Sequence, residues 1–434
     1  MLRTILASLV LACSFSLAAQ DSGILDSRIQ ELVAKYQAAT LEFRHHVHEH
    51  PELSNREHET AKLVAEHLRA LGLEVRTDIA HTGVVGVLVG GKPGPVIAVR
   101  ADMDALPVTE DTDLPFKSTV RATYNGQDVG VMHACGHDVH TAVQYGVASI
   151  LSELADEMTG TVVFIFQPAE EGPPPGEEGG ADLMLREGVF RDPVPEAVFG
   201  LHTLSGLPVG QVGMTSGPAY AAVDHFLATV RGVQTHGARP HQGIDPIVLA
   251  SQAVLAMQTI VARTLDPIQP AVVTVGMFHS GQRFNIIPAE AKLEGTVRTY
   301  DAEVRDTIER RMNEILDGIT RAGGGSYELD YQRGTPSTIN DPELTAQMIP
   351  SLRSSVGSGL FRELPPTMGG EDFAYFANEV PGFFFRLGID QQGSVNGPHH
   401  SPTFRADDRS VPIGMRVMSN VLLDYLITNA SLSH

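Results

Sequence analysis

The sequence predicts an α/β fold in which a central mixed sheet is flanked by helices and a smaller two-layer domain is inserted. Segments with helical spacing alternate with apolar runs of strand length along most of the chain. One region, from about 219 to 333, changes to the order βαββαβ. The chain has 434 residues, which is too many for one ordinary hydrophobic core and therefore indicates two domains.

The larger domain is predicted from elements that follow one another in a regular order. Its strands are compact apolar runs such as GTVVFIFQ, and its helices have apolar residues three and four positions apart. In chain order we expect helices at 26–50 and 55–71, strands at 83–91 and 95–104, a helix at 138–158, a strand at 160–167, a helix at 181–187 and a strand at 197–202. This alternation places helices on both faces of a sheet.

The inserted domain is predicted to be a ferredoxin-like βαββαβ unit. Its elements are expected as strand 224–232, helix 246–263, strands 271–278 and 291–300, helix 302–322 and strand 326–332. A helix at 342–354 and a strand at 382–388 then return the chain to the larger domain. The predicted boundaries are therefore 26–218 and 334–430 for the larger domain and 219–333 for the insertion.

The start of the chain has the composition of an export signal. Residues 1–19 combine Arg3, an apolar run and small residues suited to a peptidase, so we expect a signal peptide and a periplasmic or secreted protein. Residues 10–13 also fit a lipoprotein box, in which Cys13 would carry lipid and anchor the protein to a membrane. Cys135 is the only other cysteine, which excludes an intrachain disulfide.

The overall charge argues against several classes of partner. The formal net charge is −21, with 52 acidic and 31 basic residues, so binding to nucleic acid or to anionic lipid is not expected. After the leader we expect no run that is long and apolar enough to span a bilayer.

Metal-ligating residue types occur in four separate places. Cys135 and His137 lie two residues apart before a predicted helix, although a buried structural cysteine beside a capping histidine fits that segment equally well. Glu170 and Glu171 follow a buried strand, where open α/β sheets build their sites, although a solvated acidic loop is also possible. His202 ends another apolar strand and His400 lies in a proline-flanked loop; each alone fits a packed or capped histidine.

Taken together, these residues favour a pair of transition-metal ions. Thiolate and imidazole ligands select Zn, Mn, Co or Ni over Ca and Mg. Five protein ligands exceed one tetrahedral catalytic site with an open position, so two ions that share a ligand fit the number better. His46 and His50 also have metal-like spacing, but Pro51 follows them and we interpret them as a solvated helix end.

Six segments together resemble the M20 metallopeptidase family. They are RADMDALP (100–107), HACGHDVHTA (133–142), QPAEEG (167–172), GLHT (200–203), GGEDFAYF (369–376) and HHSPTF (399–404). The most similar branch is the one that contains hippurate hydrolases, indole-acetyl-amino-acid hydrolases and N-acyl-amino-acid amidohydrolases. The resemblance extends from about Ile29 to Leu426 and implies a metallopeptidase-like catalytic domain.

The resemblance also implies roles for individual residues. Glu170 matches the general base of the family, and Asp104 matches a carboxylate that orients a ligand histidine, here His137. The five residues that match ligands of two divalent metal ions are Cys135, His137, Glu171, His202 and His400. Metal ligation would also explain an unpaired cysteine in an exported protein.

The inserted domain resembles the satellite domain through which members of the family form homodimers. His236 matches a histidine that reaches the active site of the partner subunit and polarises the scissile carbonyl. Asn285 and Arg298 match residues that hold the substrate, and a guanidinium suits a free carboxylate. A histidine at a helix start and an arginine at a strand edge are the structural alternatives.

The function that these features imply is hydrolysis of the amide bond of N-acyl amino acids by a metal-activated water. An exported dipeptidase or carboxypeptidase of the same family is the first alternative. A non-catalytic binding protein with structural metals is the second, and the retention of Glu170 argues against it, since a structural site closes all its positions with protein ligands.

Overall fold

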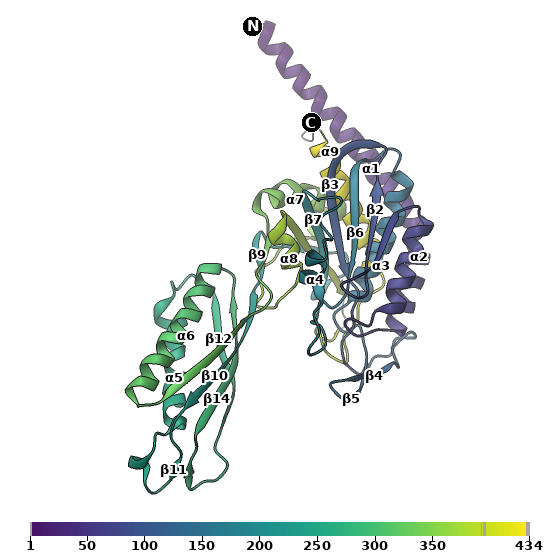
Figure 1. The fold of residues 1–434 in the computed structure, drawn as a ribbon. Coiled ribbons are helices and arrows are strands. Elements are labelled where there is room, and N and C mark those ends of the chain that lie inside the picture. The colour runs from purple at the N-terminus through teal and green to yellow at the C-terminus, as the bar shows by residue number, and fades with distance from the viewer. Residues whose placement is uncertain (1, 392, 394–395, 431–434) are drawn as a thin grey trace. The chain divides into compact units, whose positions relative to one another are not determined.

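A computed structural model describes residues 2–391, 393 and 396–430, with side chains described from residue 25 onward (Figure 1). The chain divides into two compact units. The first is built from the residues up to 216 together with 340–364 and those from 376 onward, and the second from 217–339 and 365–375. The inserted domain expected at 219–333 lies within the first segment of the second unit.

The first unit is organised around a mixed sheet of eight strands. In spatial order these are β1 (Glu74–Ile79), β2 (Gly83–Val89), β6 (Thr159–Gln167), β3 (Lys92–Asp102), β7 (Ala197–Pro208), β18 (Gly382–Asp390), β8 (Val212–Met214) and β17 (Phe361–Glu363). The four central strands β6, β3, β7 and β18 run parallel, whereas β1 pairs antiparallel with β2 and β2 with β6. Strand β8 pairs antiparallel with β18 and parallel with β17. Parallel strands are covered on both faces, which explains their nearly continuous apolar sequences.

Helices flank this sheet, as the sequence predicts (Figure 1). They are α1 (Leu2–Glu49), α2 (His58–Ala70), α3 (His137–Leu154), α4 (Gly180–Arg186), α7 (Pro342–Val356), α8 (Phe373–Glu379) and α9 (Ser410–Asn429). One buried hydrophobic cluster joins them to the strands; it includes Val147 of α3, Phe164 of β6 and Val421 of α9. This core holds the ends of the central strands in fixed positions.

Several short elements were not expected from the sequence. They are the hairpin of β4 (Arg121–Tyr124) and β5 (Gln127–Gly130), the pair of β9 (Gly217–Tyr220) and β16 (Thr338–Asn340), the strands β1, β8 and β17, and the 3-10 helix η3 (Ser358–Leu360). These runs are too short or too polar to stand out from loops by periodicity alone.

The second unit has the predicted βαββαβ order. It consists of β10 (Ala222–Arg231), α5 (Pro246–Thr259), β12 (Ala271–Ser280), β14 (Glu290–Thr299), α6 (Ala302–Ala322) and β15 (Ser326–Arg333). The strands form an antiparallel sheet in the order β12-β14-β10-β15. Both helices begin at an aspartate, Asp245 or Asp301, whose side chain accepts hydrogen bonds from backbone amides of the first turn. A separate small ladder joins β11 (Thr235–His236) to β13 (Ile286–Ile287), and the 3-10 helix η1 (Pro240–Gln242) follows β11.

One expectation about membranes needs correction. Helix α5 continues into a π-helical turn, η2 (Ile260–Thr264), and the combined segment Pro246–Thr264 is long and apolar enough to cross a membrane by length and composition. Its buried side chains include Leu249, Ala253 and Met257, which belong to the hydrophobic core of the second unit.

The expected signal peptide falls outside the residues whose side chains are described. The backbone of residues 2–19, which include Cys13, belongs to helix α1, and residue 1 is not described. The helix predicted at 26–50 corresponds to the later part of α1, which ends at Glu49. His46 and His50 are both exposed at that end, as expected.

Candidate metal centre

The residues proposed as metal ligands lie together in the first unit. The Sγ atom of Cys135 is 3.5 Å from Nε2 of His202 and 3.3 Å from Nε2 of His400. Glu171 joins the same group, because its Oε1 atom is 3.0 Å from Nε2 of His400 and 3.9 Å from Nε2 of His137. Overlapping sets of ligand atoms, each able to hold an ion, therefore connect Cys135, His137, Glu171, His202 and His400.

The central strands explain why these distant segments meet. Strands β3, β6 and β7 are parallel neighbours, so their carboxyl ends lie at one edge of the sheet. Glu170 and Glu171 follow β6, and His202 lies within β7, which is longer than the strand expected at 197–202. His400 belongs to the loop between β18 and α9, and its amide donates to the carbonyl of Ala134 at 2.8 Å.

A glycine at the start of α3 allows Cys135 and His137 to lie against β7. Gly136 has a φ of 88°, which is the left-handed conformation that favours glycine. A Cβ atom at this position would lie 2.4 Å from Oγ1 of Thr203, so any other residue would push the segment away from the strand.

Asp104 connects the ligand His137 to the turn that carries both glutamates. Its Oδ1 atom is 3.2 Å from Nδ1 of His137 and accepts the amide of Glu170 at 3.1 Å, while Oδ2 accepts the amide of Glu171 at 3.1 Å. With Nδ1 engaged in this way, Nε2 of His137 is buried and has no hydrogen-bond partner. A ring nitrogen in this situation, with its other nitrogen on a carboxylate, is the usual arrangement of a metal-bound histidine.

The electrostatics of the group favour an added positive charge. Burial, followed by the carboxylates of Glu171 and Glu170, raises the pKa of the Cys135 thiol well above its usual range. Burial alone would lower the pKa of His137, but the charges of Asp102, Asp104 and Glu171 raise it to about 10. A divalent cation would offset this negative charge and allow the thiol to ionise. The residues present thus fit a metal site.

Three nearby residues were not assigned to the site from the sequence. Asp102 accepts hydrogen bonds from Arg100 at 2.7 Å and from Nδ1 of His140 at 2.6 Å, and Nε2 of His140 accepts the amide of Thr203 at 2.8 Å. His399 places Nδ1 3.7 Å from Sγ of Cys135, and its Nε2 accepts the amide of Ser205. The histidine spacing in HACGHDVH could have identified His140, and the histidine pair in PHHSP could have identified His399; Asp102 lies in the segment RADMDALP, two residues before Asp104.

The residues expected to contact the substrate belong to the second unit and are not part of this group. His236 lies in β11, and its Nδ1 atom accepts the amide of Ala238 at 3.0 Å. Asn285 is close to it, because its carbonyl accepts the amide of Gly237. Arg298 lies in β14 and donates to Oγ1 of Thr296 at 2.8 Å, and burial lowers the pKa of its guanidinium.

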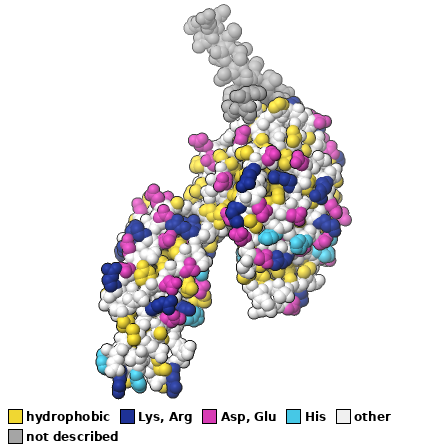
Figure 2. Space-filling view, in the orientation of Figure 1, with side chains coloured by type: hydrophobic (Ala, Val, Ile, Leu, Met, Phe, Trp, Pro, Cys, Tyr) yellow, Lys and Arg dark blue, Asp and Glu magenta, His cyan; other side chains and the backbone are white. Residues whose placement is uncertain are grey.

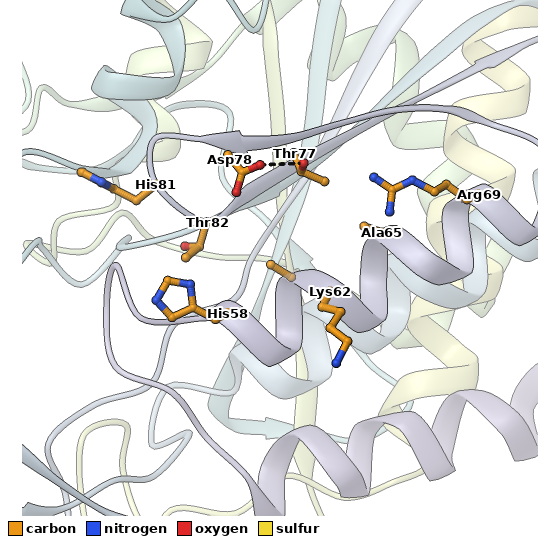
Figure 3. A pocket seen from close by; sticks show the side chains of 9 residues that line it. His58, Lys62, Ala65, Arg69, Thr77, Asp78, His81 and Thr82 are labelled. Carbon is orange, nitrogen blue, oxygen red and sulfur yellow. Dashed lines mark hydrogen bonds between the residues drawn. The ribbon is translucent and has the colours of Figure 1, made fainter.

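The first unit has several hollows, and one of them reaches the metal ligands. A cavity of about 110 Å³ has Glu171, Gly172 and Pro174 in its wall, together with Leu106 and Tyr124. Another, of about 220 Å³, lies between α2 and the turn after β1 (Figure 3), and a third, of about 500 Å³, lies along α1 beside Leu41 and His46. Neither of these two is lined by a proposed ligand, so the cavity beside Glu171 is the one that borders the ligand group.

Comparison with known proteins agrees with this arrangement. Residues 98–424 match the family described as Peptidase family M20/M25/M40. Thermostable carboxypeptidase 1 of Saccharolobus solfataricus is 40% identical over 393 residues, which cover 90% of this chain and 95% of the relative. N-acyl-L-amino acid amidohydrolase of Geobacillus stearothermophilus is 42% identical over 315 residues, covering 73% and 81% of the two chains.

A solved structure extends the similarity to the fold. The Bacillus subtilis YXEP protein, described as a dinuclear metal binding peptidase from the M20 family, superposes with a TM-score of 0.76 at 34% identity. The match covers 91% of this chain and 99% of that one. The chain therefore belongs to peptidase family M20/M25/M40 and is a hydrolase of amide or peptide bonds.

Proposed function

We propose that the protein hydrolyses the amide bond of N-acyl amino acids with two divalent metal ions in the centre described above. The observation that carries the proposal is the position of Glu170: its Oε2 atom lies 3.8 Å from Nε2 of His137, at the edge of the ligand group. Cys135, His137, Glu171, His202 and His400 would hold the ions. When bound, such a pair lowers the pKa of a water molecule and polarises a carbonyl group.

The remaining steps are assigned to side chains of this protein. Glu170 takes a proton from the attacking water and later delivers it to the leaving amine. Asp104 keeps His137 in the tautomer that leaves Nε2 for the metal. His236 would donate a hydrogen bond to the carbonyl oxygen in the active site of the partner subunit, and Asn285 and Arg298 would hold the free carboxylate of the amino acid.

The neighbouring glutamates allow a sharp test of these roles. Glu170→Ala should retain both metal ions and lose nearly all turnover, by a factor on the order of 10² to 10⁴. Glu171→Ala should lose metal instead. Metal content after dialysis and kcat on a panel of N-acetyl, N-benzoyl and N-indolylacetyl amino acids measure both effects. Full activity of metal-loaded Glu170→Ala would refute the assignment.

A carboxypeptidase or dipeptidase activity is the second candidate. It is favoured by the similarity to thermostable carboxypeptidase 1, whose matched region covers nearly all of that relative. A free carboxylate beside the scissile amide is common to both substrate classes, so Arg298 fits either one. Comparison of kcat/KM for acyl amino acids with kcat/KM for dipeptides would separate the two activities.

We further propose that the second unit mediates a homodimer and that the mature protein is exported. Figure 2 shows hydrophobic side chains exposed on the surface of this unit. The exposed residues include Val248 and Leu255 of α5 and Phe278 of β12, which is an edge strand of the sheet. Exposed apolar residues beside an open strand edge are typical of an interface.

Two measurements test these further proposals. Leu255→Glu should give monomers in sedimentation equilibrium, whereas Val89→Glu, a matched substitution of an exposed residue in the first unit, should leave the dimer intact. Fractionation of a bacterial host and the mass of the recovered protein test export: a periplasmic chain without residues 1–19, or a membrane-bound chain with lipid on Cys13, supports it, whereas an uncut chain confined to the cytoplasm contradicts it.

A further inference from the structure

We infer that Glu57 is a positioning residue that holds the catalytic turn in its active conformation, an inference that rests on the roles proposed for Glu170 and Glu171. Glu57 lies in the segment SNREHET, far from these residues in the sequence. Its side chain is fully buried. It contacts the turn through Ala169, the residue immediately before Glu170.

The side chain of Glu57 is engaged at both oxygen atoms. Its Oε1 atom accepts the amides of Ala169 and Asn55, each at 3.0 Å, and Oε2 accepts the hydroxyl of Thr82 at 2.5 Å. Thr82 comes just before β2 and lines the hollow beside α2 together with His58 (Figure 3). Glu57 thus links the catalytic turn to two other segments of the first unit.

The turn needs such support because its backbone is strained. Ala169 is buried and has a φ of 53°, a left-handed conformation that is unfavourable for a residue with a Cβ atom. The three successive amides of the turn all donate to buried carboxylates: that of Ala169 to Glu57, and those of Glu170 and Glu171 to Asp104. The two carboxylates together hold the backbone from which both glutamate side chains extend.

The alternative role for Glu57, capping of helix α2, is taken by another residue. Glu57 occupies the N-cap position of α2, but its side chain makes no capping hydrogen bond there. Glu52 accepts the amides of Glu59 and Thr60 at 3.1 and 2.9 Å instead. Since Glu52 already accepts hydrogen bonds from the first amides of α2, helix capping does not explain the buried orientation of Glu57. Its contact with the amide of Ala169 does.

Glutamine can replace most of these contacts, whereas alanine cannot. Burial, followed by the negative charge of Asp104, raises the pKa of Glu57 to about 8, so exchange of this carboxyl group for a neutral amide removes a charge that the site disfavours. The amide oxygen of Glu57→Gln can accept from Ala169 and Asn55, and the rotating Thr82 hydroxyl can accept from the new amide group. Glu57→Ala leaves both backbone amides buried and without an acceptor.

Four variants of the full chain test the inference: Glu57→Ala, Glu57→Gln, Thr82→Val and the matched control Glu52→Ala. Each is measured for kcat, KM, unfolding temperature and metal affinity by competition with a chromogenic chelator. In Glu57→Ala we expect kcat and metal affinity to fall by about 10- to 100-fold, with KM little changed. Glu57→Gln should keep most of the kcat and most of the metal affinity of the parent protein. Glu52→Ala should lower only the unfolding temperature.

Specific results would overturn the inference. A folded Glu57→Ala with the kcat and metal affinity of the parent protein would do so, as would an equal loss in Glu52→Ala. If Glu57→Ala does not fold, the test uses Thr82→Val, which removes the hydrogen bond from Thr82 to Glu57. This variant should lower kcat or metal affinity by about 2- to 10-fold. Parent-like kcat and metal affinity in Thr82→Val would refute the role of Glu57. Metal affinity requires no substrate, so failure of the parent protein to cleave acyl amino acids would be recognised separately.

Discussion

Replacement of Asp104 by asparagine should weaken metal binding although the shape of the side chain is kept. Each carboxylate oxygen of Asp104 faces two groups: Oδ1 faces the amide of Glu170 and Nδ1 of His137, and Oδ2 faces the amide of Glu171 and the Ser54 hydroxyl. Asparagine has one acceptor oxygen and one amide group that only donates. In either orientation, its NH₂ group faces a backbone N–H group at about the distance of the lost hydrogen bond.

The magnitude follows from the burial of this contact. Asp104 is 1% exposed, so a displaced amide of the turn has no water to bond with. A buried donor without an acceptor costs about 1–3 kcal/mol. If that cost falls on the metal-bound conformation, the dissociation constant for metal rises by about 5- to 150-fold. If the NH₂ group takes the place of Oδ1, His137 also loses the acceptor that keeps Nε2 available for metal.

The assay is competition for Zn or Mn between the protein and a chromogenic chelator, followed by circular dichroism to show that the variant is folded. Ser54→Ala is the matched control, because it removes one contact of the same carboxylate and leaves both amides of the turn satisfied. Its metal affinity should fall by no more than about 2- to 12-fold, the equivalent of about 0.5–1.5 kcal/mol for one hydrogen bond, and by less than that of Asp104→Asn. Parent-like metal affinity in folded Asp104→Asn would refute this account of the turn.

Three further predictions concern other parts of the molecule. Cys135→Ser replaces a soft ligand by a hard one and should weaken binding of Zn more than binding of Mn in the same competition assay; equal losses would speak against thiolate ligation. Burial lowers the pKa of His67 from 6.5 to about 4, so the folded protein binds fewer protons, and the stability present above pH 6.5 is lost as the pH falls toward 4. His67→Phe cannot titrate and should show a shallower fall in the free energy of unfolding over that range in urea, whereas an unchanged slope would contradict the assignment. Phe226→Ala, in the core of the second unit, should lower the free energy of unfolding of that unit by about 3–5 kcal/mol, and an unchanged urea midpoint would show that the core is not formed as described.

The sequence alone determined the fold class and most of the central strands. Strands buried on both faces must be almost entirely apolar, so β3, β6, β7 and β18 could be located from their composition. The βαββαβ order of the second unit was also predicted, because amphipathic helices such as α6 have a strong period. The metal-ligand types stood out because a thiol, imidazoles and carboxylates occur in or next to segments predicted as apolar strands or as helix starts.

Only the tertiary structure decided what each polar residue contacts. Asp102 and Asp104 are two residues apart in one segment, yet one pairs with His140 and the other with His137 and the turn after β6. The sequence around Glu57 is typical of a polar helix start, and its hydrophobic periodicity does not indicate that Glu57 is buried against Ala169. Periodicity records which face of an element is apolar, but a hydrogen bond between residues more than a hundred positions apart depends on how the whole chain packs.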